Sequence, residues 1–105
     1  MINKIGIIGA GQMGSGIAQK IIQEGLPCVM VDIEEEYVQR GLSNIKNTLA
    51  EAIERKIFRQ AQVDEILSRI TATTDFSAVA DADIVIEAVF EDKTVKAEVF
   101  KKLDQ

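Results

Sequence analysis

Four residues near the start of the chain have the types and the spacing of a phosphate-binding turn with an acidic partner. Gly9, Gly11 and Gly14 form a G-x-G-x-x-G pattern directly after a short apolar run. Asp32 follows Gly14 by 18 residues and comes directly after a second apolar run. The glycine pattern alone would be a weak signal, but a strand, a glycine turn, a helix and a following acid together are the fingerprint of a dinucleotide-binding βαβ unit.

Each position of this fingerprint has a chemical reason. Gly9 lets the chain turn sharply, Gly11 leaves room for a pyrophosphate, and Gly14 lets the helix pack closely on the strands. The first amides of that helix attract phosphate charge. The predicted cofactor-binding segment is Gly9, Ala10, Gly11, Gln12, Met13 and Gly14. Asp32 would bind the ribose hydroxyls and repel a 2′-phosphate, so we expect NAD rather than NADP. The alternative is a plain tight turn with Asp32 as a helix cap.

Composition narrows the function classes. The 105 residues carry 12 Lys and Arg against 17 Asp and Glu, a formal net charge of −5. This acidic balance argues against a nucleic-acid or anionic-membrane surface. No apolar run reaches the ~20 residues of a membrane span. We therefore expect one small domain in the cytoplasm.

Two residue counts limit the chemistry further. The sequence contains no histidine and one cysteine, Cys28, which lies within an apolar run. A His-based triad, a His metal cluster and a histidine general base are therefore excluded on this chain. We predict no catalytic residue and no metal ligand, and we interpret Cys28 as a buried apolar residue.

Hydrophobic periodicity predicts the remaining elements. Helices are expected over residues 12–24, 34–55, 62–69 and 92–103, and strands over 4–8, 28–32, 70–74 and 83–89. Asp75 or Ser77 could cap a short turn. In the first helix, Met13, Ile17, Ala18 and Ile21 are expected to face inward. Gly41 is interpreted as a weak point in the long helix, and the fourth strand reads as one buried on both faces.

This order predicts a doubly wound parallel sheet with a helical hairpin inserted after the second strand. The expected spatial strand order is 3-2-1-4, with right-handed crossovers. The cofactor crevice would then lie between the first and fourth strands, where the order reverses. Val89, Phe90 and Glu91 are expected beside the glycine loop.

With these residues in place, the chain resembles the Rossmann-type NAD-binding domain of the L-3-hydroxyacyl-CoA dehydrogenases, and it looks closest to the bacterial 3-hydroxybutyryl-CoA branch. The resemblance rests on IGAGQMGSGIAQ (residues 8–19), VD (31–32), RGL (40–42), TTD (73–75) and ADIVIEAVFED (82–92). The last of these segments is the most specific, because many Rossmann families share only the glycine loop.

The resemblance implies oxidation of 3-hydroxyacyl-CoA to 3-ketoacyl-CoA with NAD, usually by a dimer. It places Glu91 beside the nicotinamide half of the cofactor, and Lys96 at the same cofactor. In the family the hairpin also contacts the CoA phosphates. Lys46, Arg55 and Lys56 are the cations available here, and they read equally well as surface charges.

The resemblance also implies a missing half. The family's catalytic histidine, its partner glutamate and its helical substrate and dimerisation domain would follow residue 105. We therefore expect residues 1–105 to be an incomplete NAD-binding domain that is inactive alone, exposes its fourth strand as an edge and self-associates. Two alternatives remain open at this point. One is a dehydrogenase of the 3-hydroxyisobutyrate or 6-phosphogluconate type, and the other is a nucleotide-sensing module without catalysis.

Overall fold

The computed structural model describes residues 2–88 of the chain. Four strands alternate with helices in this region. In chain order they are β1 (Ile5–Ile8), α1 (Gln12–Gln23), β2 (Cys28–Val31), α2 (Glu35–Glu54), α3 (Gln60–Leu67), β3 (Ile70–Thr73), the 3₁₀ helix η1 (Phe76–Val79) and β4 (Ile84–Glu87). The elements expected within residues 2–88 are present, with ends that differ from the expected ones by at most two residues. The helix expected over 92–103 lies outside the described residues.

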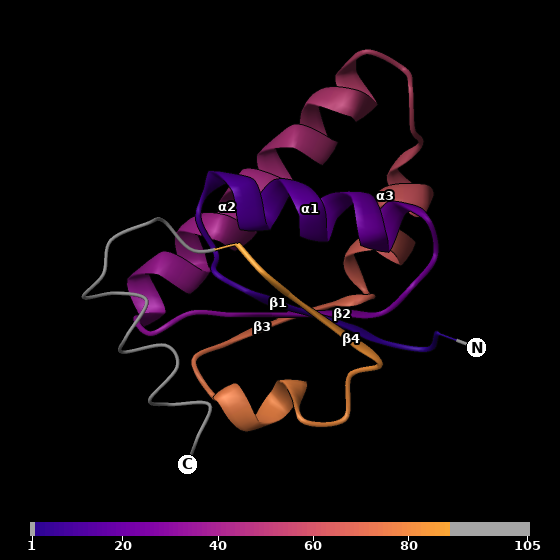
Figure 1. The fold of residues 1–105 in the computed structure, drawn as a ribbon. Helices are drawn as coiled ribbons and strands as arrows, with labels where there is room; N and C mark the ends of the chain where they lie inside the picture. Colours follow the sequence, from indigo (N-terminus) through magenta and orange to yellow (C-terminus); the bar gives the residue numbers. More distant parts are fainter. Residues whose placement is uncertain (1, 89–105) are drawn as a thin grey trace.

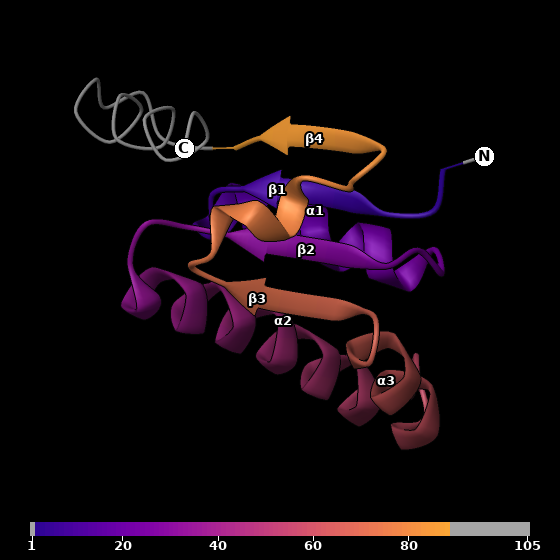
Figure 2. The same cartoon turned by 90° about the horizontal axis from the view of Figure 1, so that it is seen from below.

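The strands form one parallel sheet in the order β3-β2-β1-β4, as predicted (Figure 2). Ile5 of β1 is aligned with Cys28 of β2 on one side and with Ile84 of β4 on the other. The chain moves outward from β1 through β2 to β3, then returns to pair β4 with the free side of β1. The order therefore reverses at β1 and β4, at whose carboxyl ends a parallel sheet of this kind binds its ligand.

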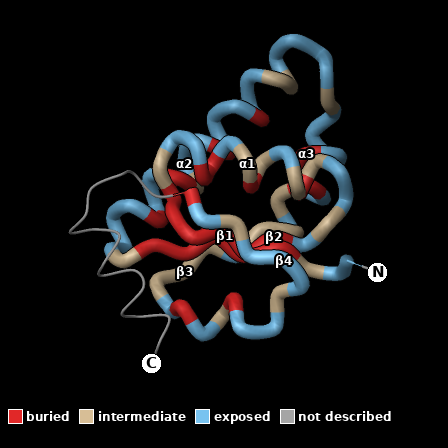
Figure 3. Tube along the Cα trace, viewed as in Figure 1, coloured by how far each residue is buried: buried red, intermediate tan, exposed pale blue. Residues whose placement is uncertain are grey.

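The two faces of the sheet are covered unequally. The helices α1, α2 and α3 lie on one face, and the short η1 lies on the other (Figure 1). On the helical face the core includes Ile7, Ile22, Met30, Ile45 and Leu49, and Figure 3 shows buried residues along β1 and β2. On the opposite face, a smaller cluster contains Ile8, Val29, Val31, Phe76 and Val79. Both faces of β1 and β2 are thus buried, as their apolar sequences require.

The inward face of α1 differs from the prediction at one residue. Ala18 and Ile22 are buried, and Ile17 and Ile21 pack against the core from its margin. Met13, however, is 67% exposed, so the prediction that it faces inward is wrong. The buried positions of α1 include Gly14, Ala18 and Ile22, which follow one another at intervals of four residues. Met13 precedes this stripe by one residue and is turned away from the sheet.

The fourth strand is also less buried than its sequence suggests. Ile84 is 40% exposed and Val85 is 46% exposed, and β4 lies at the edge of the sheet within residues 2–88. The prediction of a strand buried on both faces is therefore wrong for the described part of the chain. The prediction that this strand is an edge is confirmed there. A continuous apolar run reports the chemistry of a strand but not how many neighbours the strand has.

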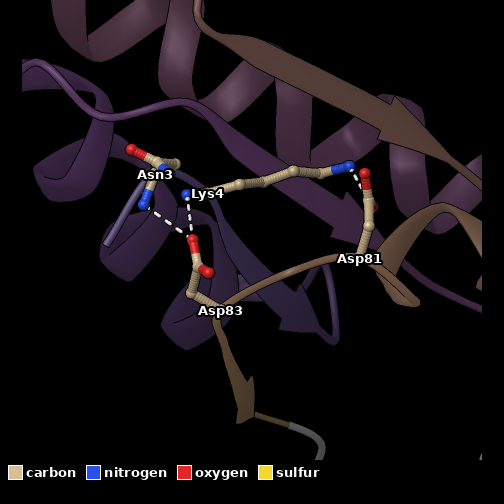
Figure 4. A network of polar contacts seen from close by, with 4 residues as sticks. All are labelled: Asn3, Lys4, Asp81 and Asp83. Atoms are coloured by element: carbon tan, nitrogen blue, oxygen red, sulfur yellow. Dashed lines mark hydrogen bonds and ion pairs between the residues drawn. The ribbon is translucent and has the colours of Figure 1, made fainter. Parts of the chain in front are cut away.

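A polar network fixes the entry to β4 against the start of β1 (Figure 4). The Asp83 carboxylate accepts hydrogen bonds from the backbone N–H groups of Asn3, at 2.6 Å, and Lys4, at 3.0 Å. The Lys4 ammonium group pairs with Asp81 at 2.6 Å. Because Asp83 immediately precedes β4 and Asp81 lies two residues before Asp83, these contacts hold the start of β4 beside β1.

Candidate functional site

The glycine loop follows β1 with a conformation that requires glycine at its first position. Gly9 has φ +114°, a backbone region that side chains strongly disfavour. Its N–H donates a 2.7 Å hydrogen bond to the carbonyl oxygen of Val31, which ends β2. The chain therefore leaves β1 while still bound to β2, and turns at once toward α1.

Gly14 is required for a different reason, which is space. A Cβ atom placed on Gly14 would overlap the carbonyl oxygen of Gly9 and lie 2.7 Å from its carbonyl carbon. Gly14 is buried in the first turn of α1, so the helix begins directly against the turn that precedes it. The sequence predicted that Gly14 lets the helix pack closely on the strands. In the structure the overlapping atoms belong to Gly9 in the loop, and Ile7 of β1 lies at ordinary contact distance, 3.5 Å.

The start of α1 presents backbone donors. Gly11 is the N-cap, and it offers no side-chain acceptor to the helix. The first N–H groups of a helix have no acceptor within the helix itself, so the amides that follow Gly11 can bind an anion with the support of the helix dipole. Gln12 and Met13 are exposed at this position. Gly11 has φ −71°, so the backbone conformation does not require glycine at this position.

Asp32 lies at the end of β2 and contacts the glycine loop. Its side chain is largely buried, with the residue 8% exposed. One carboxylate oxygen accepts a hydrogen bond from the N–H of Ala10 at 2.8 Å, and the other accepts one from the N–H of Ile33 at 2.7 Å. A carboxylate has about four acceptor sites, so both oxygens keep capacity for further donors such as hydroxyl groups. Sequence reasoning found Asp32 but not its bond to Ala10.

The end of β4 lies beside the start of the glycine loop. The N–H of Ala88 donates to the carbonyl oxygen of Ile8 at 2.7 Å, so the chain leaving β4 runs beside the residue that precedes Gly9. The strand order reverses between β1 and β4, and the crevice predicted there remains a prediction. Glu91 and Lys96, the two further predicted cofactor-binding residues, lie outside the described residues.

A groove of about 420 Å³ adjoins the glycine loop on its other side. It runs from Gly11 and Gln12 between α1 and α2, and α2 contributes Arg40, Asn44 and Thr48. None of the three cations considered from the sequence, Lys46, Arg55 and Lys56, lines it. Arg40 pairs with Glu36 at 2.7 Å, one turn away on the same helix.

The described residues give little support for a metal site or a cysteine nucleophile. Residues 2–88 contain no group of three or more His, Cys, Asp or Glu side chains placed to hold a metal ion. Cys28 is 1% exposed, and burial raises the pKa of its thiol to about 12, so it is a poor nucleophile. No helix in this part of the chain is long and apolar enough to cross a membrane.

Comparison with known proteins identifies the family. A family model described as "3-hydroxyacyl-CoA dehydrogenase, NAD binding domain" matches residues 4–105. The chain belongs to this family. The match covers nearly the whole sequence, and it favours the hydroxyacyl-CoA dehydrogenases over the 3-hydroxyisobutyrate type. The cofactor of the family is NAD, in agreement with the prediction from Asp32.

Relatives and solved structures agree with this assignment. The chain is 41% identical over 102 residues to a probable 3-hydroxybutyryl-CoA dehydrogenase of Deinococcus radiodurans. This alignment covers 97% of this chain and 36% of that protein. The chain is also 41% identical over 103 residues to a fatty acid oxidation complex subunit alpha of Psychrobacter, covering 98% of this chain and 14% of that protein. The crystal structure of (S)-3-hydroxybutyryl-CoA dehydrogenase from Ralstonia eutropha superposes with a TM-score of 0.89 at 38% identity, over 99% of this chain and 37% of that one.

These shares define what the chain corresponds to in its relatives. It spans about a third of the length of the 3-hydroxybutyryl-CoA dehydrogenases that it matches, and a smaller part of the fatty acid oxidation subunit. The chain therefore corresponds to the NAD-binding domain of these relatives. It does not cover the rest of their length.

Proposed function

We propose that the glycine loop and Asp32 hold the adenosine and pyrophosphate half of NAD. The supporting observation is that Asp32 and the amides at the start of α1 converge on the same short loop, through the Asp32–Ala10 hydrogen bond. The chemistry of these groups fits the cofactor, because backbone amides at a helix start suit a pyrophosphate and a carboxylate suits ribose hydroxyls. In this proposal Gly9 to Gly14 bind the pyrophosphate and Asp32 binds the ribose hydroxyls.

Asp32 also gives a physical reason for selecting NAD. The carboxylate already accepts two backbone hydrogen bonds, which fix its position at the end of β2 beside the glycine loop. A 2′-phosphate placed beside this charge would be repelled in a largely buried setting, where screening by salt is weak. The two ribose hydroxyls, in contrast, would donate to the free acceptor sites.

The remaining cofactor contacts are proposed from the family resemblance. Glu91 would lie beside the nicotinamide half, and Lys96 would reach the same cofactor. Both residues follow β4, and the chain leaving β4 at Ala88 runs beside Ile8 and the glycine loop. To test these two contacts, the NAD affinity of the Glu91→Gln and Lys96→Met variants is measured. We expect each substitution to lower it.

We further propose that the parent activity is the interconversion of 3-hydroxyacyl-CoA and 3-ketoacyl-CoA. NAD, when bound, supplies the hydride acceptor for the carbon that bears the hydroxyl group. The residues of this chain bind and orient the cofactor, but they include no histidine to take the hydroxyl proton. Because general acid–base help is commonly worth about 10²–10⁴-fold, we expect the chain alone to be inactive in acetoacetyl-CoA reduction with NADH.

Acyl-CoA is the substrate partner in this proposal, and a homo-oligomer is the proposed assembly. The groove between α1 and α2 supports the first of these, since it adjoins the glycine loop and carries Arg40 on its α2 side. Charge reversal by Arg40→Glu should weaken binding of CoA to this chain, whereas Arg59→Glu, outside the groove, should not.

Calorimetric titration of the chain with NAD and then with NADP tests the proposal. We expect saturable NAD binding, weaker or absent NADP binding, and loss of NAD binding in Asp32→Ala. Glu34→Ala is the matched control, because it removes an exposed carboxylate two residues away that makes no side-chain cap bond to α2. Equal affinity for NAD in the Asp32 and Glu34 variants, or no NAD binding by the folded chain, would refute the assignment.

A further inference from the structure

A glycine in the middle of α2 lies against the glycine loop. Gly41 is buried on the same face of α2 as Val38, Ile45 and Leu49. A Cβ atom placed on Gly41 would overlap the carbonyl oxygen of Ala10, and it would lie 3.1 Å from the Cβ of Ala10. The Cε of Met30 would also be 3.1 Å away. The inserted hairpin therefore contacts the loop backbone itself.

Ala10 is held from two sides by this arrangement. Its N–H donates to Asp32 at 2.8 Å, and its carbonyl oxygen faces the backbone of α2 at Gly41. Ala10 lies between Gly9, which makes the turn, and Gly11, which caps α1. The backbone of Ala10 is thus held between the end of β2, where Asp32 accepts its N–H, and the middle of α2, which lies against its carbonyl oxygen.

A side chain at position 41 would clash with the loop, and only a movement of the backbone could remove this clash. The overlapping atom belongs to the main chain of Ala10, not to the end of a flexible side chain. The helix α2 cannot easily move outward, because Val38, Ile45 and Leu49 anchor the same face in the core. Interiors packed this closely transmit a displacement instead of absorbing it, so an added methyl group would shift the loop.

From this geometry we infer that Gly41 is a positioning residue for cofactor binding. It acts through Ala10, by letting α2 form the rear wall of the glycine loop and fix the loop in the conformation that receives the pyrophosphate. The inference rests on the proposed NAD site. Helix propensity alone points the other way, because alanine is a better helix former than glycine. A loss of binding in Gly41→Ala would therefore come from the contact with the loop.

The test compares Gly41→Ala with Gly16→Ala in the complete chain. Gly16 is also a helical glycine, but a Cβ placed there meets nothing within 4 Å. We expect Gly41→Ala to lower NAD affinity by roughly tenfold to a hundredfold, the scale of one or two lost hydrogen bonds to a charged group. Gly16→Ala should keep the affinity of the unmodified chain. In ¹H–¹⁵N spectra without ligand, the amide signals of Gly9, Ala10 and Gly11 should move in the first variant only.

Each outcome decides the inference. Gly41→Ala with unchanged loop signals and unchanged NAD affinity would overturn it. Should this variant fail to fold, NAD is titrated into the unmodified chain instead, and amide signals around residue 41 must move together with those of the loop. Signals that move in the loop while those of α2 stay fixed would equally overturn it. Absence of NAD binding by the unmodified chain refutes the proposed function, and the loop signals of the ligand-free variant then still decide the role of Gly41.

Discussion

The carboxylate of Asp32 accepts a hydrogen bond from the backbone N–H of Ala10, joining two residues that are 22 positions apart in the chain. This bond gives the acid a structural role that precedes any ligand. The Asp32 carboxylate at the end of β2 holds the turn that follows β1 by accepting this hydrogen bond. A residue that the sequence marks for ribose binding is therefore also part of the framework of the phosphate-binding loop.

Asp32→Asn should separate these two roles. The amide oxygen can still accept from Ala10, but the NH₂ group then faces the N–H of Ile33 as donor against donor. We expect the free energy of unfolding, measured by urea denaturation, to fall by about 1–3 kcal/mol, the cost of an unsatisfied partly buried group. The discrimination between NAD and NADP should shrink as well, because the charge that repels the 2′-phosphate is gone.

Glu34→Gln serves as the control for Asp32→Asn, since it removes an exposed charge close by. If both substitutions left stability and cofactor preference unchanged, the Asp32–Ala10 bond would have no energetic importance. A loss of stability without any change in preference would restrict Asp32 to its structural role.

Gly14→Ala should be among the most damaging small substitutions. Its methyl group would overlap the main chain of Gly9, and misfit of this kind typically costs about 1–3 kcal/mol, occasionally more. The urea midpoint should fall and NAD binding should be lost. Gly16→Ala, in open space two residues later, should instead gain up to about 1 kcal/mol from helix propensity. A neutral Gly14→Ala would contradict the close packing described here.

The sequence predicted most of this fold because its signals are local. The glycine turn and the periodicity of the apolar residues located the helices and strands of residues 2–88 and predicted the spatial order of the strands. The predicted site residues from Gly9 to Gly14 and Asp32 lie together in the structure. Their roles in binding remain predictions, as do those of Glu91 and Lys96.

The errors concern relations between distant segments. Met13 has the spacing of an inward residue, but helical spacing does not say which of two neighbouring stripes faces the sheet. Gly41 was interpreted as a flaw in a helix, because nothing near it in sequence reveals that Ala10 lies against it. The exposure of Val85 depends on which strands stand beside β4, and this is a tertiary property.

Cys28 should be almost unreactive in the folded chain. Burial raises the pKa of its thiol from 9.0 to about 12, so the thiolate fraction at pH 8 falls about a thousandfold. Modification by a disulfide reagent, followed by absorbance, should be slow in buffer and fast in concentrated guanidinium chloride. Rapid reaction of the folded chain would mean that β2 opens far more readily than its burial implies.

Stability at acid pH should depend on Asp81. A side-chain hydrogen bond from Lys4, aided by its charge, lowers the pKa of this carboxyl below its ordinary value of 3.8. Since the folded pKa lies below the unfolded one, the stabilisation is fully present above pH 3.8 and is lost as the pH falls through the lowered value. Asp81→Asn should therefore unfold with a weaker pH dependence in this range, measured by thermal melts. Asp64→Asn, an exposed acid of α3, is the control, and high salt should reduce the difference.

The exposed edge at β4 should lead to self-association of this chain. Val85 is 46% exposed on a strand whose outer backbone groups have no neighbouring strand within residues 2–88. Sedimentation velocity should show a weight-average mass that rises with concentration, and Val85→Lys should reduce the rise. Ile57→Lys, at an equally apolar exposed position in the hairpin turn, should not. A monomer at all concentrations would contradict this prediction.

The neighbouring strands β1 and β4 are far apart in the sequence, so they are also synthesised at different times. The contact between Asn3 and Asp83 spans 80 residues, so a ribosome that adds 5–20 residues per second needs roughly 4 to 16 s between making one strand and making the other. Within this interval the phosphate-binding turn and its acidic partner are synthesised before the strand that ends beside them. A ligand that contacts both β1 and β4 would therefore report the arrival of β4, and its binding during synthesis would mark the moment at which β4 joins the sheet.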